Sequence, residues 1–328
     1  MSEFGTSQRV VQRALAPLVE SGLIEVRRGF GMRIARLPEH PPATYAGDCL
    51  ILYRDSESRL ARTLLIELKA RLLKQGGSIV MRAFGDEAGA LEFLETHGRF
   101  RCCLLQTNFE TVTVGFLAAI RAHADGLVID GVSVTGIDAD VIGTNWREAL
   151  SVGYRMLRDQ GHEKIGFLTS NHDARQIAMA RREFLLLSGW EGPMPHPRLH
   201  AVSRLPGSYT RQDLEAALPD PDDRQESMTA LIVWGLVDGY LMDSALRNKG
   251  LRPGRDLSLL LLGSVDVPSE HVSQFDIVGN SDAEKLDLFE SIVTSRIAGS
   301  SSPQHTHYLP IYTHVNGSIR LLDATIEK

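Results

Sequence analysis

Glutamine and arginine side chains gather near the amino terminus at spacings that suit contact with a nucleic acid. Apolar residues at three- and four-residue intervals between Val10 and Val19 predict a helix with one apolar face. Thr6 or Ser7 is its expected N-cap, and Pro17 predicts that it ends or bends near Ala16. The polar side chains mainly on its other face are Gln8, Arg9, Gln12 and Arg13. Amide and guanidinium groups on a helix can bind base edges in a DNA major groove.

A basic hairpin is predicted next, with its tip at Arg28-Gly29-Phe30-Gly31 between two short strands. Arginines on such a tip can enter a minor groove or bind phosphate. On spacing alone, this DNA-binding interpretation and a plain solvated helix with a basic hairpin are equally supported.

The distribution of charge separates the head from the body. The 328-residue chain has a formal net charge of −6, but residues 1–38 hold six arginines and three glutamates. A small basic head on an acidic body indicates that only the head meets a polyanion. Three cysteines cannot form a disulfide framework and are predicted as buried strand thiols in a cytoplasmic protein.

Catalytic and metal-binding patterns are missing from the sequence. It contains no P-loop, no GxGxxG after a strand, no HExxH and no GxSxG. The close histidine pair His305 and His307 offers two ligands without a third, which favours a solvated loop over a metal site. We therefore predict a protein that is not an enzyme and that uses neither a cofactor nor a metal.

Short apolar runs alternate with helical patterns from about residue 47 onward. Unbroken apolar runs are typical of parallel strands buried on both faces. The predicted strands span residues 49–53, 78–83, 101–106, 126–129, 139–142, 164–169, 197–202, 230–233 and 258–262. The predicted helices span residues 59–75, 87–97, 112–124, 146–160, 175–188, 211–217 and 239–249. The alternation predicts an α/β fold with two doubly wound parallel-sheet subdomains.

The head, TSQRVVQRALAPLVESGLIEVRRGFGMRIA, resembles the second half of the winged helix-turn-helix of GntR-type bacterial regulators. This resemblance implies DNA contacts from Ser7, Gln8, Arg9, Gln12 and Arg13 in the helix and from Arg28, Gly29 and Gly31 in the wing. A whole winged helix has roughly 30 further residues before Phe4. We therefore expect a truncated winged helix, residues 1–36 that are mobile or packed unusually, and weak DNA binding by this chain alone.

The body resembles the effector domain of LacI/GalR-type regulators, which is related to periplasmic sugar-binding proteins. The best matching blocks are residues 141–145, 161–168, 250–258, 263–266, 308–310 and 316–318. A winged helix joined to such a domain is similar to the arabinose-repressor type. The resemblance implies a DNA-binding segment at 1–37, a linker at 38–47 and an effector-binding domain at 48–328. In that domain the chain crosses between lobes near 143–145, 275–281 and 304–309, so lobe N spans about 48–143 plus 278–304 and lobe C about 146–275 plus 309–328.

The resemblance also implies an effector site between the lobes, formed by Tyr209, Arg181, Asn145, Asp55, Trp234 and Asp266. Tyr209 corresponds to an aromatic residue that stacks on a sugar, and Arg181 to an arginine that binds it. Tyr209 as a surface turn residue, Arg181 paired with Glu183, and Trp234 as a core residue are the alternatives.

Two departures from the family pattern bear on the ligand. Gly235-Leu236 replaces a usual Asn-Asp, and Val265 replaces an aspartate before Asp266. These changes predict a less polar cleft, a different ligand, or none. The resemblances predict a homodimeric, ligand-responsive repressor that binds operator DNA and a monosaccharide and has no membrane partner. The alternative is a sugar-binding module without a DNA role.

Overall fold

The computed structural model describes residues 8–20, 24–27, 31–34, 45–55, 59–107, 109, 111–131, 138–219, 228–236, 239–266 and 275–322. The head consists of α1 (Gln8–Glu20) and an antiparallel hairpin, β1 (Ile24–Arg27) with β2 (Gly31–Ile34). Of the two predicted effects of Pro17, an end or a bend near Ala16, the end does not occur, because α1 continues to Glu20, and the bend stays a prediction. Pro17 and Arg13 are exposed, so water can replace the backbone hydrogen bond that proline removes.

The first parallel sheet defines the N lobe. Its strand order is β13-β7-β6-β5-β3-β4, and all its pairings are parallel. The strands are β3 (Tyr45–Arg54), β4 (Ile79–Phe84), β5 (Arg99–Gln106), β6 (Ala124–Asp130), β7 (Asp140–Thr144) and β13 (Thr306–Leu309). One face packs against α2 (Arg59–Lys74) and α9 (Asp282–Ile297), and the other against α3 (Glu87–His97) and α4 (Val114–His123). Both faces are thus covered, which explains the unbroken apolar runs.

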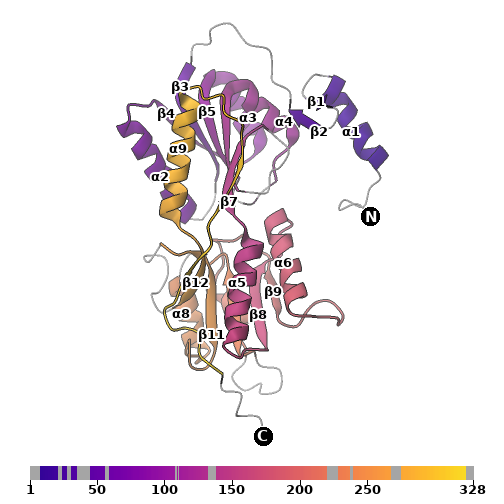
Figure 1. The fold of residues 1–328 in the computed structure, drawn as a ribbon, viewed down its shortest axis with the longest axis vertical. Helices are drawn as coiled ribbons and strands as arrows, with labels where there is room; N and C mark the ends of the chain where they lie inside the picture. The colour runs from indigo at the N-terminus through magenta and orange to yellow at the C-terminus, as the bar shows by residue number, and fades with distance from the viewer. Residues whose placement is uncertain are drawn as a thin grey trace.

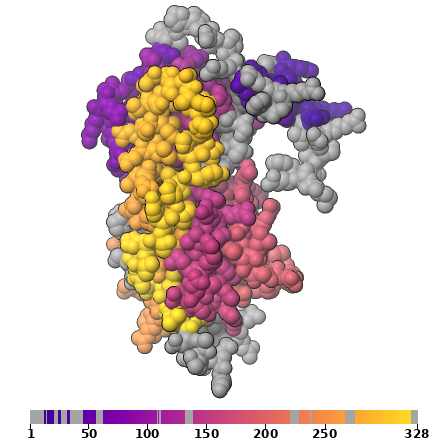
Figure 2. Space-filling view, in the orientation of Figure 1, coloured from indigo at the N-terminus to yellow at the C-terminus, as the bar shows by residue number. Residues whose placement is uncertain are grey.

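The second sheet defines the C lobe, in the order β14-β12-β11-β10-β8-β9. Its strands are β8 (Ile165–Ser170), β9 (Leu199–Val202), β10 (Ala230–Trp234), β11 (Ser258–Ser264), β12 (Asp276–Asn280) and the antiparallel edge strand β14 (Tyr312–His314). One face carries α5 (Trp146–Asp159) and α6 (Arg175–Leu187), and the other α7 (Arg211–Ala217) and α8 (Gly239–Asn248). Figure 1 shows the two lobes one above the other, and Figure 2 shows the same face of the molecule in a space-filling view. The predicted pair of doubly wound parallel sheets is confirmed.

The chain passes between the lobes at three places, which we call the hinge. It leaves β7 for α5 at Asn145, leaves β12 for α9 at Ser281, and leaves β13 for β14 at Pro310 and Ile311. The third crossing predicted at residues 304–309 is wrong, because pairing of β13 with β7 keeps the chain in the N lobe as far as Leu309. The predicted start of the returning N-lobe segment at residue 278 is also too early, since β12 pairs with β11 in the C lobe.

The structure confirms that the three cysteines are buried strand residues. Cys49, Cys102 and Cys103 are free thiols and are fully buried in β3 and β5, as predicted. Burial raises the pKa of the Cys103 thiol well above its usual range. No helix among the described residues is long and apolar enough to cross a membrane.

Candidate functional site

The direction of the strands places the site between the lobes. β7 ends at the first hinge crossing, so the carboxyl ends of the strands parallel to it point toward the C lobe. β12 likewise ends at the second crossing, so the carboxyl ends of β8, β10 and β11 point toward the N lobe. Ligands of open α/β sheets bind outside the carboxyl ends of the strands. Here both sets of carboxyl ends meet at the same interlobe region.

A polar cluster of one buried and two half-buried side chains occupies the N-lobe side of this region. Gln106 at the end of β5 donates a hydrogen bond from Nε2 to Oδ2 of Asp130, at 2.9 Å, at the end of β6. Lys285 of α9 places Nζ 2.8 Å from Oδ1 of the same carboxylate. Burial opposes the charge of Lys285, but the negative charges of Asp130 and Asp282 outweigh it and raise the lysine pKa. Sequence analysis missed this cluster, because its members lie far apart in the chain.

Hydrogen bonds between side chains join the lobes at the hinge. Thr144 Oγ1 at the end of β7 donates to Asn280 Oδ1 at the end of β12, at 2.8 Å, and both residues are buried. Tyr312 of β14 donates to both carboxylate oxygens of Glu284 in α9, at 2.7 and 2.9 Å. These bonds connect residues on opposite sides of a crossing and therefore respond to any change in the angle between the lobes.

Asp266 also lies at the hinge. It follows β11, and its Oδ2 accepts a hydrogen bond from the Ser281 hydroxyl and another, at 3.0 Å, from the backbone N–H of Ala283. The carboxylate thus satisfies a free N–H in the first turn of α9, where the helix dipole favours a negative charge. The structure gives this predicted effector residue a role in binding the start of α9, and its effector contact stays a prediction.

Three aromatic residues meet between the lobes. Trp234 ends β10, Trp146 opens α5 directly after the first crossing, and Phe109 lies in the N-lobe loop after β5. The ring centroid of Trp234 lies 5.4 Å from that of Trp146 and 5.9 Å from that of Phe109, the latter edge to face. Trp234 is 2% exposed, whereas Trp146 and Phe109 are half-buried. We call these three residues the aromatic cluster.

Tyr209, the predicted sugar-stacking residue, is buried in the C-lobe core. It is 5% exposed, and its hydroxyl donates to the backbone carbonyl of Trp234 at 3.0 Å. Burial raises the pKa of this phenol well above its usual value. The alternative of a surface turn residue is wrong, and the ring is covered by protein in this structure. Its predicted stacking role therefore requires the core around it to open.

The other predicted effector residues have local partners in this structure. Asn145 is the N-cap of α5, where its side chain accepts from the backbone N–H of Glu148. Asp55 follows β3, is exposed, and lies 3.4 Å from an Nη of Arg62. Arg181 lies on α6, 3.9 Å from a carboxylate oxygen of Asp173. Glu183, its expected alternative partner, instead pairs with Arg147 and accepts from Ser151.

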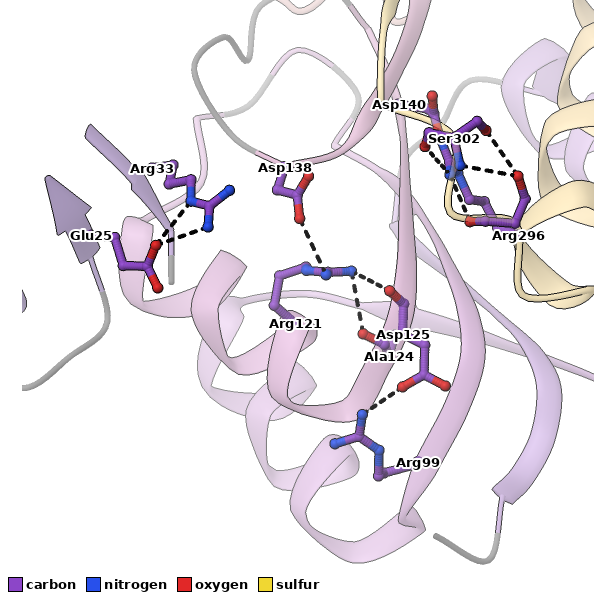
Figure 3. Close-up of polar contacts among 11 residues, drawn as sticks. Glu25, Arg33, Arg99, Arg121, Ala124, Asp125, Asp138, Asp140, Arg296 and Ser302 are labelled. Atoms are coloured by element: carbon purple, nitrogen blue, oxygen red, sulfur yellow. Dashed lines mark hydrogen bonds and ion pairs between the residues drawn. The ribbon is translucent and has the colours of Figure 1, made fainter. Parts of the chain in front are cut away.

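The predicted DNA-contacting residues fall partly outside the described residues. Ser7, Arg28 and Gly29 lie outside them. Gln8 and Arg9 form the first turn of α1, and Gly31 opens β2. Gln12 and Arg13 are exposed on α1. Arg33, counted among the head's basic residues, is engaged with Glu25 across the hairpin at 2.9 Å (Figure 3).

Ion pairs lie at the amino ends of the N-lobe strands, away from the candidate site, and stabilise the lobe. Figure 3 shows Arg99 with Asp125, at 2.6 Å, and Arg296 with Asp140, also at 2.6 Å. These acids lie near the starts of β6 and β7, away from the carboxyl ends where a ligand would bind. His307 lies 3.5 Å from Asp140 in this scaffold, and its neighbour His305 is exposed.

Several solved structures that are similar to this chain are transcriptional regulators. The transcriptional regulator CelR in complex with cellobiose aligns with a TM-score of 0.67 at 14% identity, over 96% of this chain and 92% of its own. A LacI family regulator from Enterococcus faecium with bound ribose aligns at 0.65 and 12% identity, over 84% and 100%. The LacI family regulator CCPA from Weissella paramesenteroides with bound glucose aligns at 0.64 and 13% identity, over 84% and 98%.

These similarities show that the chain has the two-lobed effector-binding fold of LacI-type regulators. No protein-family model matches the sequence. No curated protein matches it significantly.

Proposed function

We propose that this protein is a ligand-responsive transcriptional repressor of the bacterial cytoplasm. A homodimer binds operator DNA through α1 and the β1–β2 hairpin, and a small effector with a sugar part binds between the lobes. The arrangement of the hinge carries the proposal: three crossings join two sheets whose carboxyl ends face each other. A ligand held between the lobes stabilises the arrangement that it fits best and shifts the population toward it.

Features of the head support the DNA part of the proposal. α1 exposes Gln12 and Arg13, and a two-stranded hairpin follows it, which is the order of a recognition helix and a wing. The head carries the chain's basic surplus on an otherwise acidic protein. The regulator–cellobiose complex matches 96% of this chain, more than the 84% matched by the ribose- and glucose-bound structures.

The effector part rests on polar groups at the carboxyl ends of the strands. Asp55, Asn145 and the Gln106–Asp130–Lys285 cluster offer the carboxylate, amide and ammonium groups that bind hydroxyls in pairs. The regulators of this fold that carry cellobiose, ribose and glucose support a sugar as the polar part of the ligand. In this proposal Arg181, Trp234 and Asp266 line the same region.

A gel-shift titration of the full-length gene product against the DNA upstream of its own gene tests the proposal. We expect retardation that weakens steeply with salt, because Lys and Arg contacts release counterions from DNA. Arg13→Ala should weaken binding by about five- to hundredfold, the usual effect of losing a contacting arginine. Arg247→Ala removes the same charge from an exposed C-lobe side chain, which is 78% exposed, and should leave binding unchanged.

Two outcomes would overturn this function. The absence of salt-sensitive retardation would remove the DNA role, and a monomer in light scattering would favour the sugar-binding module instead. A thermal-shift screen of monosaccharides and cellobiose tests the effector part separately, since a ligand of the folded state raises Tm.

A further inference from the structure

We propose that the aromatic cluster is a subsite for a planar aromatic ring, so that the effector joins such a ring to its hydroxylated part. The inference rests on the proposed effector function and names the chemistry of one half of its ligand. Trp146 and Trp234 form the C-lobe wall of this subsite, and Phe109 of the N lobe occupies the place that the ligand's ring takes.

The aromatic cluster belongs to the C-lobe core, which confirms the alternative of Trp234 as a core residue, but it lies at the interlobe end of that core. Trp234 stands at the carboxyl end of β10, and Trp146 stands at the first hinge crossing. Phe109 comes from the other lobe, three residues after Gln106 of the polar cluster. The Phe109–Trp234 contact therefore joins the two lobes, and it forms or breaks when the angle between them changes.

The backbone of Phe109 is strained. Its φ is 69°, and among the residues that the structure describes it is the one non-glycine residue with positive φ. A bulky side chain adopts this left-handed conformation only when surrounding contacts hold it there. The edge-to-face contact with Trp234 supplies such a contact, and a ligand ring stacked on the same partners can replace it while the loop relaxes.

The C-lobe wall beside the cluster is apolar. Gly235 has a φ of 90°, and a Cβ there would lie only 2.6 Å from Cβ of Pro206, so no polar side chain fits at this position. Leu236 and Val265 pack in the C-lobe core on the other face of the sheet, so they offer no polar group to the aromatic cluster. The hydroxyl of Tyr209 is already bonded to the carbonyl of Trp234. The aromatic cluster offers ring faces and edges, whereas the groups proposed to bind hydroxyls lie outside it.

The polar half of the site lies on the facing lobe. Gln106 is 5% exposed and is bonded to Asp130, which also pairs with Lys285. Gly131 lies against Gln176 of the C-lobe helix α6, where a Cβ on Gly131 would be 3.7 Å from Nε2. A ligand that spans the region thus meets the Gln106–Asp130–Lys285 cluster and the aromatic cluster, which selects a molecule with one polar and one planar apolar part.

Matched pairs of probes test this inference by isothermal titration calorimetry on the full chain. Ribose is compared with adenosine, and glucose with phenyl β-glucoside, so that each pair shares its sugar and differs in the ring. We expect at least one ring-bearing probe to bind about three- to tenfold or more tightly than its bare sugar, the range that one aromatic contact supplies. Trp146→Leu should abolish this preference, and Trp146→Phe should restore part of it.

Phe109→Gly should act in the opposite direction. Glycine adopts the positive φ without strain and removes the phenyl ring that occupies the subsite. The preference for the ring-bearing probe should therefore rise. Trp190→Leu is the matched control, because Trp190 packs against His196 outside the cluster and should leave every affinity unchanged.

Equal binding of the two members of both pairs, or tighter binding of the bare sugars, would overturn the aromatic subsite and leave the proposed regulator standing. A ring preference that survives Trp146→Leu would also overturn it. If no probe binds, the inference is again wrong, and the gel-shift result still decides the proposed function on its own.

Discussion

At the scale of residues, a buried ion pair stabilises the N lobe at the amino end of β7. Arg296 and Asp140 form a buried ion pair at 2.6 Å, with side chains only 6% and 3% exposed. Arg296 also donates to the backbone carbonyls of Ser300 and Ser302, at 3.1 and 2.7 Å, so the pair fixes the segment between α9 and β13. Gly126 permits this arrangement, because a Cβ there would lie 2.8 Å from Cβ of Arg296.

Removal of one partner should destabilise the protein strongly. Arg296→Met leaves the Asp140 carboxylate buried without its counter-charge, and we expect the free energy of unfolding to fall by about 3–5 kcal/mol. Urea denaturation of the two proteins measures this change. Arg247→Ala, which breaks a largely exposed pair with Asp243, should cost no more than about 0.5 kcal/mol. A loss of less than about 1 kcal/mol for Arg296→Met would show that the pair is not structurally important.

At the scale of elements, α9 connects the lobes. It packs on the N-lobe sheet beside α2, where Leu286, Phe289 and Val293 are buried, and its first turn is held by residues of the hinge. The Ser281 hydroxyl accepts from the backbone N–H of Glu284, while Asp266 of the C lobe accepts from that of Ala283. The start of α9 is therefore shared between the lobes.

The role of Asp266 can be separated from effector binding. If the carboxylate mainly satisfies the first turn of α9, Asp266→Ala should lower the free energy of unfolding by about 0.5–2 kcal/mol without ligand, as loss of a helix cap does. Thermal and urea denaturation of the ligand-free protein measure this loss. Asp173→Ala is the control, because Asp173 is fully exposed and forms only a 3.9 Å pair. Unchanged stability with reduced effector affinity would assign Asp266 to the ligand instead.

At the scale of the whole molecule, three histidines of the C lobe resist protonation; His162 and His196 are buried, and His200 is half-buried. Burial lowers the pKa of His162, His196 and His200, and neighbouring positive charge at Arg198 and Arg320 adds to the effect at His196 and His162. The two ring nitrogens of His162 are hydrogen-bonded, Nδ1 to the hydroxyl of Thr229 at 2.9 Å and Nε2 to the backbone carbonyl of Arg320 at 3.1 Å. The unfolded chain therefore binds more protons than the native one in mildly acidic solution.

Acidification should consequently weaken the C lobe. Because the folded pKa values lie below the unfolded value of about 6.5, stability is complete above that pH and falls as the pH drops through it. We expect a lower Tm at about pH 5.5 than at about pH 7.5, with hydrogen exchange in β8 and β9 accelerated first. His196→Phe should reduce the slope, and His305→Ala, which alters an exposed histidine, should not. A Tm independent of pH over this range would contradict the prediction.

The sequence by itself determined the class of fold and the order of its elements. Unbroken apolar runs and helical periodicity predict α3 and α7 with the same ends that the structure shows, because each strand or helix buries its face locally. The same patterns predict the cysteines as buried strand residues. They failed to predict α9 and the strands β12, β13 and β14. They left open whether Pro17 ends or bends α1, because solvent exposure decides whether a proline stops a helix.

Only the tertiary structure decided which side chains form the site. Gln106, Asp130 and Lys285 meet because parallel strands end together at one edge and a helix from the far end of the chain packs across them. Tyr209 is buried in the core, where its hydroxyl donates to the backbone carbonyl of Trp234. Asp266 accepts a hydrogen bond from the backbone N–H of Ala283 at the start of α9. A local pattern reports which face of an element is apolar, whereas the partners of a polar side chain depend on residues that folding brings together across long stretches of sequence.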